Sequence, residues 1–156
     1  MMVRPATQSD LLRINELRRQ VNDLHVAGRP DVFRPGFSQE LQDHVNVLFA
    51  GDGREILVAE AEGAVVGFAC LRYVDRPESP YRNAIKYVEI EEIGVDAACQ
   101  RQGAGRLLTD AVRSRAREMG YSRVELNMWE FNENALAFYE RIGFRTYRRY
   151  MELDVD

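Results

Sequence analysis

YVEIEEIGVDAACQRQGAGRLL, residues 87–108, contains the clearest structural signal in the chain. Its first half is rich in β-branched residues, which predicts a strand that ends near Val95. Two glycines, Gly103 and Gly105, then break the pattern, and apolar residues recur afterwards at helical spacing. The segment therefore predicts a strand, a tight turn and a helix. Because the first amides of a helix lack partners within it and lie at its positive end, such a turn binds anions, phosphates above all.

Outside this unit, hydrophobic periodicity and turn residues predict the remaining elements. We expect strands at residues 3–6, 55–62, 64–74, 123–129 and 145–153, and helices at residues 7–27, from Ser38 to about Phe49, and at 134–142. The resulting order, βααβββαβαβ, predicts an α/β (α+β) fold in which one mixed, mostly antiparallel sheet is flanked by helices. At this length we expect a single domain over residues 1–156.

Composition narrows the class of protein. The chain is 46% hydrophobic and 29% charged, as is usual for a soluble globular domain. Its net charge of −4 argues against nucleic acid as a partner and suits a cationic substrate. No apolar run could span a membrane, and the N-terminus lacks a signal pattern. Cys70 and Cys99 show neither metal-ligand spacing nor a disulfide framework. We therefore expect a cytoplasmic protein without a metal site.

Two motifs carry a resemblance to a known family. Gln100-x-x-Gly103-x-Gly105 resembles the Arg/Gln-x-x-Gly-x-Gly/Ala motif of the GCN5-related N-acetyltransferase (GNAT) superfamily. Asn132 and Tyr139, within NENALAFYERIGF, resemble the downstream signature of that family, and the two motifs occur in the expected order. The resemblance implies the GNAT fold, acetyl-CoA as acyl-donor cosubstrate, and direct transfer of acetyl to a primary amine in a ternary complex. The acceptor would be a small-molecule amine or a protein or peptide amine.

The resemblance also implies which residues bind acetyl-CoA. The turn would hold the pyrophosphate through main-chain amides, and the preceding strand would bond the pantetheine arm where the fourth and fifth strands splay apart. Asn132 would bond the same arm. The implied residues are Ile93, Gly94, Val95, Gln100, Arg101, Gln102, Gly103, Ala104, Gly105, Arg106, Asn132 and Tyr139.

Tyr139 and a run of glutamates are the candidate catalytic residues. By resemblance, Tyr139 is the acid that serves the thiolate leaving group, since a phenol can donate a hydrogen bond or a proton to it. An alkylammonium must lose a proton before it attacks, and a carboxylate can accept that proton. Glu89 and Glu91 share a face on a regular strand, whereas Glu92 would point the other way. Glu89 and Glu91 each match the position of the base in some members of the family, so both stay candidates. A β-bulge would shift the alternation of side chains between the two faces of the strand.

Three alternatives stay open at this stage. Gly103-x-Gly105 fits the first half of a dinucleotide-binding fingerprint, although Leu108 replaces its third glycine, and Glu125 lies near its acidic position. A fold relative that binds the acyl-CoA as a non-catalytic sensor or partner module is the second. The glutamates could also form ordinary ion pairs with neighbouring arginines, which is the third.

The resemblance suggests where an acceptor would bind and how copies would associate. The segment between the first two helices, with Phe33 and Phe37, and the loop at residues 75–83 would shape acceptor choice. Trp129 would line the pocket or fill the core, whereas His25 and His44 are expected to be structural or solvated. A homodimer is compatible with the resemblance, because many relatives pair through edge strands or the C-terminal strand.

Overall fold

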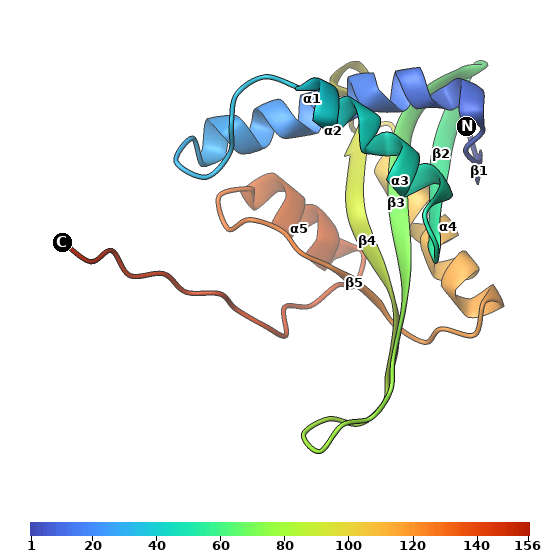
Figure 1. Ribbon diagram of the computed structural model, residues 1–156. Helices are drawn as coiled ribbons and strands as arrows, with labels where there is room; N and C mark the ends of the chain where they lie inside the picture. Colours follow the sequence, from blue (N-terminus) through green and yellow to red (C-terminus); the bar gives the residue numbers. More distant parts are fainter.

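A five-stranded sheet forms the middle of the molecule in the computed structural model, which describes residues 1–156 (Figure 1). The strands lie side by side in chain order: β1 (Met2–Pro5), β2 (Arg54–Ala61), β3 (Ala64–Arg76), β4 (Ile85–Val95) and β5 (Val124–Leu126). Neighbouring strands are antiparallel except β4 and β5, which are parallel. The predicted mixed, mostly antiparallel sheet is confirmed.

Helices cover both faces of the sheet. The helices are α1 (Leu11–Gly28), α2 (Gln39–Asp43), α3 (Val45–Ala50), α4 (Ala104–Glu118) and α5 (Glu133–Arg141), with 3-10 turns η1 (Gln8–Asp10) and η2 (Ala97–Cys99). One core cluster packs α1 and α3 on β2 and β3, and a second packs α4 on the opposite face of β2, β3 and β4. The sheet therefore separates an α1–α3 face from an α4 face.

Local sequence signals account for several of these elements. Glu62 and Gly63 both adopt positive φ, at 52° and 79°, which is the backbone that joins β2 to β3 in a two-residue hairpin. The Ser38 hydroxyl accepts a hydrogen bond from the Leu41 amide and starts α2, as its residue type predicts. The expected second helix is divided into α2 and α3 at His44.

Two predicted strands differ from the structure. Residues 145–153 form no strand, and no main-chain hydrogen bond joins residues 145–156 to the rest of the chain. Figure 1 shows this segment running away from the body. A strand requires a neighbour that completes its ladder, so its composition alone did not specify one here. The fifth strand is also shorter than the predicted residues 123–129, because the chain leaves the sheet after Leu126.

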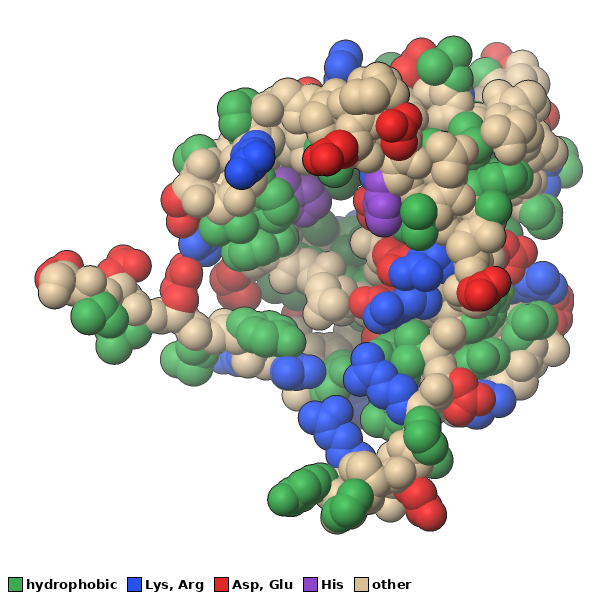
Figure 2. Space-filling model, viewed as in Figure 1, with side chains coloured by type: hydrophobic (Ala, Val, Ile, Leu, Met, Phe, Trp, Pro, Cys, Tyr) green, Lys and Arg blue, Asp and Glu red, His purple; other side chains and the backbone are tan.

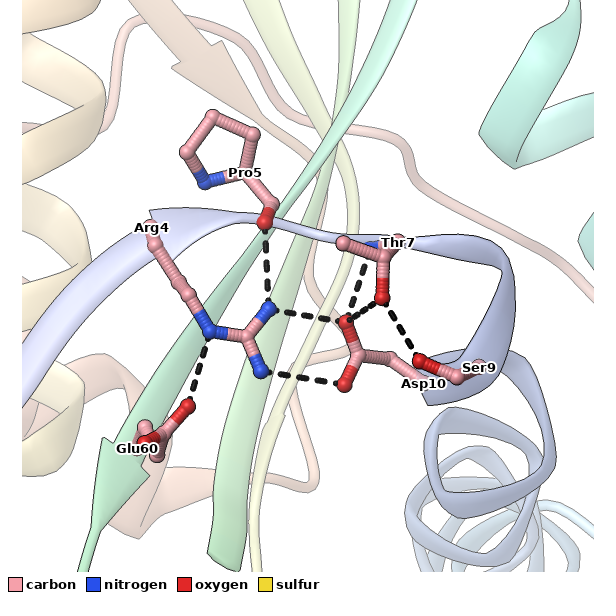
Figure 3. Close-up of polar contacts among 6 residues, drawn as sticks. All are labelled: Arg4, Pro5, Thr7, Ser9, Asp10 and Glu60. Atoms are coloured by element: carbon pink, nitrogen blue, oxygen red, sulfur yellow. Dashed lines mark hydrogen bonds and ion pairs between the residues drawn. The ribbon is translucent and has the colours of Figure 1, made fainter. Parts of the chain in front are cut away.

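A charged network fixes the N-terminus to the sheet (Figure 3). Arg4 of β1 makes a bidentate pair with Asp10, at 2.8 and 3.1 Å, and also bonds Glu60 of β2 at 2.8 Å. Asp10, nearly buried, accepts further hydrogen bonds from the Thr7 amide at 2.7 Å and the Thr7 hydroxyl at 2.9 Å. One carboxylate thus ties β1 to the start of α1.

We expect Asp10→Asn to lower the free energy of unfolding at pH 7 by about 2 kcal/mol, the usual loss for a hydrogen bond to a charged group. The pKa of the Asp10 carboxyl lies well below its ordinary value, chiefly because Arg4 donates hydrogen bonds to it. A lowered folded-state pKa stabilises the fold above the unfolded pKa of about 3.9, and this stabilisation is lost as pH falls.

Urea unfolding at pH 7 and at pH 3 checks both expectations. The wild type should lose more stability than Asp10→Asn over that interval, because the variant has no carboxylate to protonate there. Asp52→Asn, at an exposed turn, is the matched control and should leave the pH dependence unchanged. Identical pH dependence in wild type and Asp10→Asn would contradict this assignment.

Candidate active site

The turn before α4 presents free main-chain amides. Arg101 and Gly103 adopt left-handed φ values of 63° and 91°, and Gly103 directly precedes the first residue of α4. No side chain caps this helix, so its first amides have no acceptor within the chain. A left-handed residue is strained unless it is glycine, which explains Gly103 at this point. The turn has the geometry that binds an anion at a helix N-terminus.

Asp96 anchors the segment between β4 and this turn. Its carboxylate accepts a hydrogen bond from the Ala98 amide at 3.0 Å and a charged bond from Arg13 of α1. The Ala98 amide and then Arg13 hold the pKa of the Asp96 carboxyl below its ordinary value. Arg13 also donates to the Val65 carbonyl at 3.1 Å. The entry to the anion-binding turn is therefore held against α1 and β3.

Strands β4 and β5 separate beside this turn. They pair only where Val88 to Ile90 lie against Val124 to Leu126. Beyond Ile90, β4 continues to Val95 with β3 on one side and no strand on the other. The splay that the family resemblance implied is present, and it leaves main-chain groups of residues 91–95 free on the β5 side.

Close packing explains why residue 94 is a glycine. A Cβ atom on Gly94 would lie 2.7 Å from Cγ2 of Val21 and 2.9 Å from the Phe68 ring. Both distances are shorter than normal contacts between carbon atoms. Gly94 therefore lets α1 and β3 side chains pack closely against β4.

A β-bulge sets the direction of the three glutamates. Cys70 of β3 pairs with Glu92 and Leu71 pairs with Ile90, so Glu91 is an extra residue on β4. Such an insertion shifts the alternation of side chains along a strand. Glu92 therefore lies on the α1–α3 face, where it bonds Arg18 of α1, and the prediction that it points away from the other glutamates was wrong.

Each glutamate is paired with arginine. Arg72 donates to Glu89 at 2.9 Å from Nε. Arg54 makes a bidentate pair with Glu91 at 3.0 and 3.2 Å, and Arg18 makes one with Glu92 at 2.7 and 3.2 Å. The ion pairs that the sequence left open as an alternative are therefore present. The arginines neutralise the charge of the three glutamates and keep their carboxylates in place.

Glu89 differs from its neighbours in one respect. Both of its contacts with Arg72 use Oε2, so Oε1 has no partner in the chain. In Glu91 and Glu92, each carboxylate oxygen accepts from an arginine. The Glu89 side chain is also largely shielded, with 17% exposed. Among the three, only Glu89 has a carboxylate oxygen without a hydrogen-bond partner in the chain.

Tyr139 lies on α5 with its ring against Phe138 and Phe144. The residue is buried, with 9% exposed, and its hydroxyl bonds no protein group. Burial raises the pKa of its phenol to about 12. Phe138, its neighbour, would lie 3.2 Å from a Cβ on Gly105, so α5 packs against the first turn of α4. The phenol is thus a neutral donor near the anion-binding turn.

Asn132 caps α5 rather than standing free. Its side-chain oxygen accepts from the Ala135 amide at 3.2 Å, so only its amide nitrogen is left to donate. This capping role is one that residue type alone could have predicted.

An aromatic group joins the end of α1 to the segment that follows β5. The Phe33 ring lies edge-on to Trp129 at 5.3 Å, and the Arg29 guanidinium lies 5.3 Å from the centre of the Trp129 ring. His25 and Phe131 complete this group. Figure 2 shows the molecule hollowed on this side, below the α1–α2 region. Phe37, which was expected to shape acceptor choice, is instead buried and packs under the Arg18 guanidinium.

Other sequence candidates lie outside this arrangement. Cys70 is buried on β3, and burial raises the pKa of its thiol, which makes it a poor nucleophile. Cys99 lies on η2, and His44 is exposed between α2 and α3. Sequence reasoning missed Asn22 of α1, whose buried amide nitrogen has no hydrogen-bond acceptor in the chain. No periodicity or motif distinguishes it.

Comparisons with known proteins agree with this arrangement. The model of the acetyltransferase (GNAT) family matches residues 18–144. Mycothiol acetyltransferase of Jonesia denitrificans is 33% identical over 66% of this chain and 31% of its own length. L-ornithine N5-acetyltransferase NATA1 of Arabidopsis thaliana is 29% identical over 77% of this chain and 52% of its own. The chain thus spans about a third to a half of these relatives.

Solved structures extend the likeness over the whole chain. A mutant of the BH1408 protein of Bacillus halodurans superposes with a TM-score of 0.94, at 29% identity, over 99% of both chains. Aminoglycoside N-acetyltransferase AAC(6')-Iy, solved with a bisubstrate analog, gives a TM-score of 0.74 at 19% identity over 99% of this chain and 97% of its own, and so shares the fold. The chain belongs to the acetyltransferase (GNAT) family.

The dinucleotide alternative does not fit the structure. Leu108, at its third glycine position, is fully buried in the α4-face core. Glu125, at the acidic position of the fingerprint, lies opposite Glu89 in the sheet. Glu89 is six residues before the end of β4, so Glu125 lies about 20 Å from the end of the strand that leads to the turn.

None of the helices has both the length and the apolar character needed to cross a membrane.

Proposed function

We propose that this protein is an acetyl-CoA-dependent N-acetyltransferase that acts on a primary amine. The observation that carries the proposal is the combination of an uncapped helix N-terminus at Gly103 with a strand, β4, whose residues 91–95 are unpaired on one side. The first offers amides to phosphate, and the second offers main-chain groups to an extended amide-containing chain. Acetyl-CoA carries both of these features in one molecule.

The residues that would hold acetyl-CoA are those of the turn and the open edge of β4. Amides from Arg101 to Arg106 would face the pyrophosphate, and the exposed Arg101 and Arg106 side chains add positive charge there. Ile93 to Val95 would bond the pantetheine arm, and the free amide nitrogen of Asn132 would donate to the same arm. The thioester supplies the activated acetyl group when the cosubstrate is bound.

Glu89 is our choice for the base. An ammonium acceptor must release a proton before its nitrogen can attack, and the free Oε1 of Glu89 can accept it directly or through a water. Arg72 holds the carboxylate in one orientation through the other oxygen. The Phe33–Trp129 group and Arg29 would contact the body of the acceptor, because they combine aromatic and charged surface between the end of α1 and the segment after β5.

Tyr139 would stabilise the leaving thiolate. With a phenol pKa of about 12 against about 8.5 for an ordinary thiol, complete proton transfer from Tyr139 is uphill. A hydrogen bond from the neutral phenol to the developing negative charge has no such cost. Tyr139 therefore acts as a donor to the sulfur, and the thiolate takes its proton from water afterwards.

A panel of amines with acetyl-CoA as donor tests the function. Thiol release from acetyl-CoA should depend on the amine, and at least one small-molecule or peptide amine should give N-acetylated product by mass spectrometry. Tight binding of acetyl-CoA without amine-dependent thiol release across small amines, aminoglycosides and peptides would favour a non-catalytic acyl-CoA sensor instead.

For Tyr139→Phe we expect kcat to fall by about tenfold or more, with little change in acetyl-CoA affinity, because the ring still packs while the donor is lost. Steady-state kinetics and calorimetric titration with CoA measure the two effects separately. Phe138→Tyr, which adds a hydroxyl on the neighbouring position, is a control for general disturbance of α5. Unchanged turnover in Tyr139→Phe would remove this residue from the mechanism.

The pH dependence of kcat/KM distinguishes the glutamates. Glu89→Gln should lower kcat/KM by about 10²-fold or more and flatten the acid limb, because no carboxylate then accepts the amine proton. Glu91→Gln should keep the acid limb, since both its oxygens already serve Arg54. An unaltered acid limb in both variants would exclude this strand as the source of the base.

A further inference from the structure

The face of the sheet that carries Glu89 continues toward the β3–β4 hairpin. Tyr87 and Ile85 share this face with Glu89, because side chains alternate along a strand and the bulge in β4 lies beyond all three. Arg76 of β3 lies opposite Ile85 in the register of the sheet. Arg123 directly precedes β5, and its guanidinium lies 5.8 Å from the centre of the Tyr87 ring. The proposed base is thus at one end of a row of side chains that leads to the hairpin.

An open cavity of about 680 Å³ lies over this row. Its volume is within the range that small-molecule sites occupy in proteins. The lining residues come from the hairpin, from β4 and β5, and from the C-terminal segment, and most are polar or charged. They are Arg76, Arg82, Asn83, Ile85, Tyr87, Arg123, Glu125, Tyr147 and Arg148. Figure 2 shows Lys and Arg side chains gathered toward the hairpin.

The cavity has an excess of positive charge. Glu125 is the one acid in its lining, and Glu125 is already occupied: the Tyr147 hydroxyl donates to Oε1, and the Arg123 guanidinium lies 3.6 Å from the same oxygen. The other arginines in the lining form no ion pair within the chain: Arg76, Arg82 and Arg148. The charge of these three side chains is therefore left for a ligand.

Uncompensated arginines around a cavity favour an anionic ligand. A guanidinium presents planar N–H donors that match a phosphate or a carboxylate in two parallel hydrogen bonds. The same charges repel a cation. The net charge of −4 suits a cationic substrate for the chain as a whole, but it does not describe the local field over this face.

The cavity and the proposed base lie within the reach of one small molecule. A strand rises by about 3.3 Å per residue, so Tyr87 lies about 7 Å from Glu89 along β4, and Ile85 lies about 13 Å from it. A molecule of this length can place an amine at Glu89 and an anionic group among the arginines. A shorter amine would reach only one of the two.

We propose that the acceptor is a small-molecule primary amine that also carries an anionic group, which Arg76, Arg82 and Arg148 bind while the amine faces Glu89. The inference rests on the proposed function, because it assigns the class of acceptor for the same site. Arg76 and Arg82 are then residues that determine specificity, and a polycation such as an aminoglycoside is a poor acceptor.

Amines that share a chain of six methylenes test the charge preference. 6-Aminohexyl phosphate ends in an anion, 6-aminohexanol in a neutral group and 1,6-diaminohexane in a cation. With acetyl-CoA as donor, kcat/KM should be highest for the phosphate, by about tenfold or more over the alcohol, and lowest for the diamine. 7-Aminoheptanoate, which carries a carboxylate on the same methylenes, should also exceed the alcohol, and its ratio to the phosphate shows which anion the arginines prefer.

Variants of the hairpin arginines connect this preference to the cavity. Arg76→Gln/Arg82→Gln should bring the ratio of kcat/KM between the phosphate and the alcohol close to one, and Arg76→Glu/Arg82→Glu should favour the diamine over the phosphate. Arg117→Gln/Arg141→Gln removes two exposed arginines that form no ion pair, lowers the net charge equally and should keep the wild-type ratio. Far-UV circular dichroism should be the same for all of these proteins, because the substituted side chains are exposed.

Calorimetric titration with hexyl phosphate tests the cavity without acetyl transfer. The protein is saturated with CoA, so that the turn before α4 is occupied, and hexyl phosphate has no amine to react. Hexyl phosphate should bind the wild type and should bind Arg76→Gln/Arg82→Gln about tenfold or more weakly. If this difference is found while no amine is acetylated, the anion site stands and the proposed function fails. Equal binding by the two proteins, or equal kcat/KM for the phosphate and the alcohol in the wild type, would overturn the proposal.

Discussion

Strand β4 is paired differently on its two edges, and the candidate site depends on this difference. One edge is hydrogen-bonded to β3 along the length of the strand, whereas the other meets β5 over three residues only. Main-chain groups in residues 91–95 are thus left without an internal partner, which a folded protein rarely tolerates away from water or a ligand. The α4 N-terminus directly follows this open edge. An extended ligand with a charged end can therefore follow one continuous run of main-chain donors and acceptors.

The bulge in β4 adds chemistry to this scaffold. A regular strand would have divided Glu89, Glu91 and Glu92 between the two faces, with at least one against the α4-face core. The inserted residue places all three beside Arg18, Arg54 and Arg72. A neutralised patch of this kind limits the cost of gathering like charges in a partly shielded place. It also leaves one oxygen, on Glu89, that no arginine uses.

Local signals in the sequence predicted most of the fold and the outline of the site. Several signals act within a few residues, so a single sequence is enough to find them. They are the glycines at 103 and 105, the Ser38 cap and the helical spacing after residue 104. The bulge and the glutamate–arginine pairs arise between segments distant in sequence, and no local pattern specifies them. The missing final strand has the same cause, because its ladder depends on what lies beside it. The roles proposed for Tyr139 in catalysis and for Asn132 in binding the cosubstrate came from the family resemblance, whereas the capping role of Asn132 follows from its residue type.

Gly28 joins two regions that are far apart in the chain. A Cβ at this position would lie 2.2 Å from the Phe131 ring, so the absence of a side chain lets the end of α1 rest on the segment that leads into α5. Any larger residue would require the Phe131 ring, just before α5, to move. The proposed acceptor side is thereby packed directly against the segment that leads to Tyr139, the proposed donor to the leaving group. Substitutions meant to reshape the proposed acceptor side should therefore keep glycine at position 28 and vary the surrounding rings.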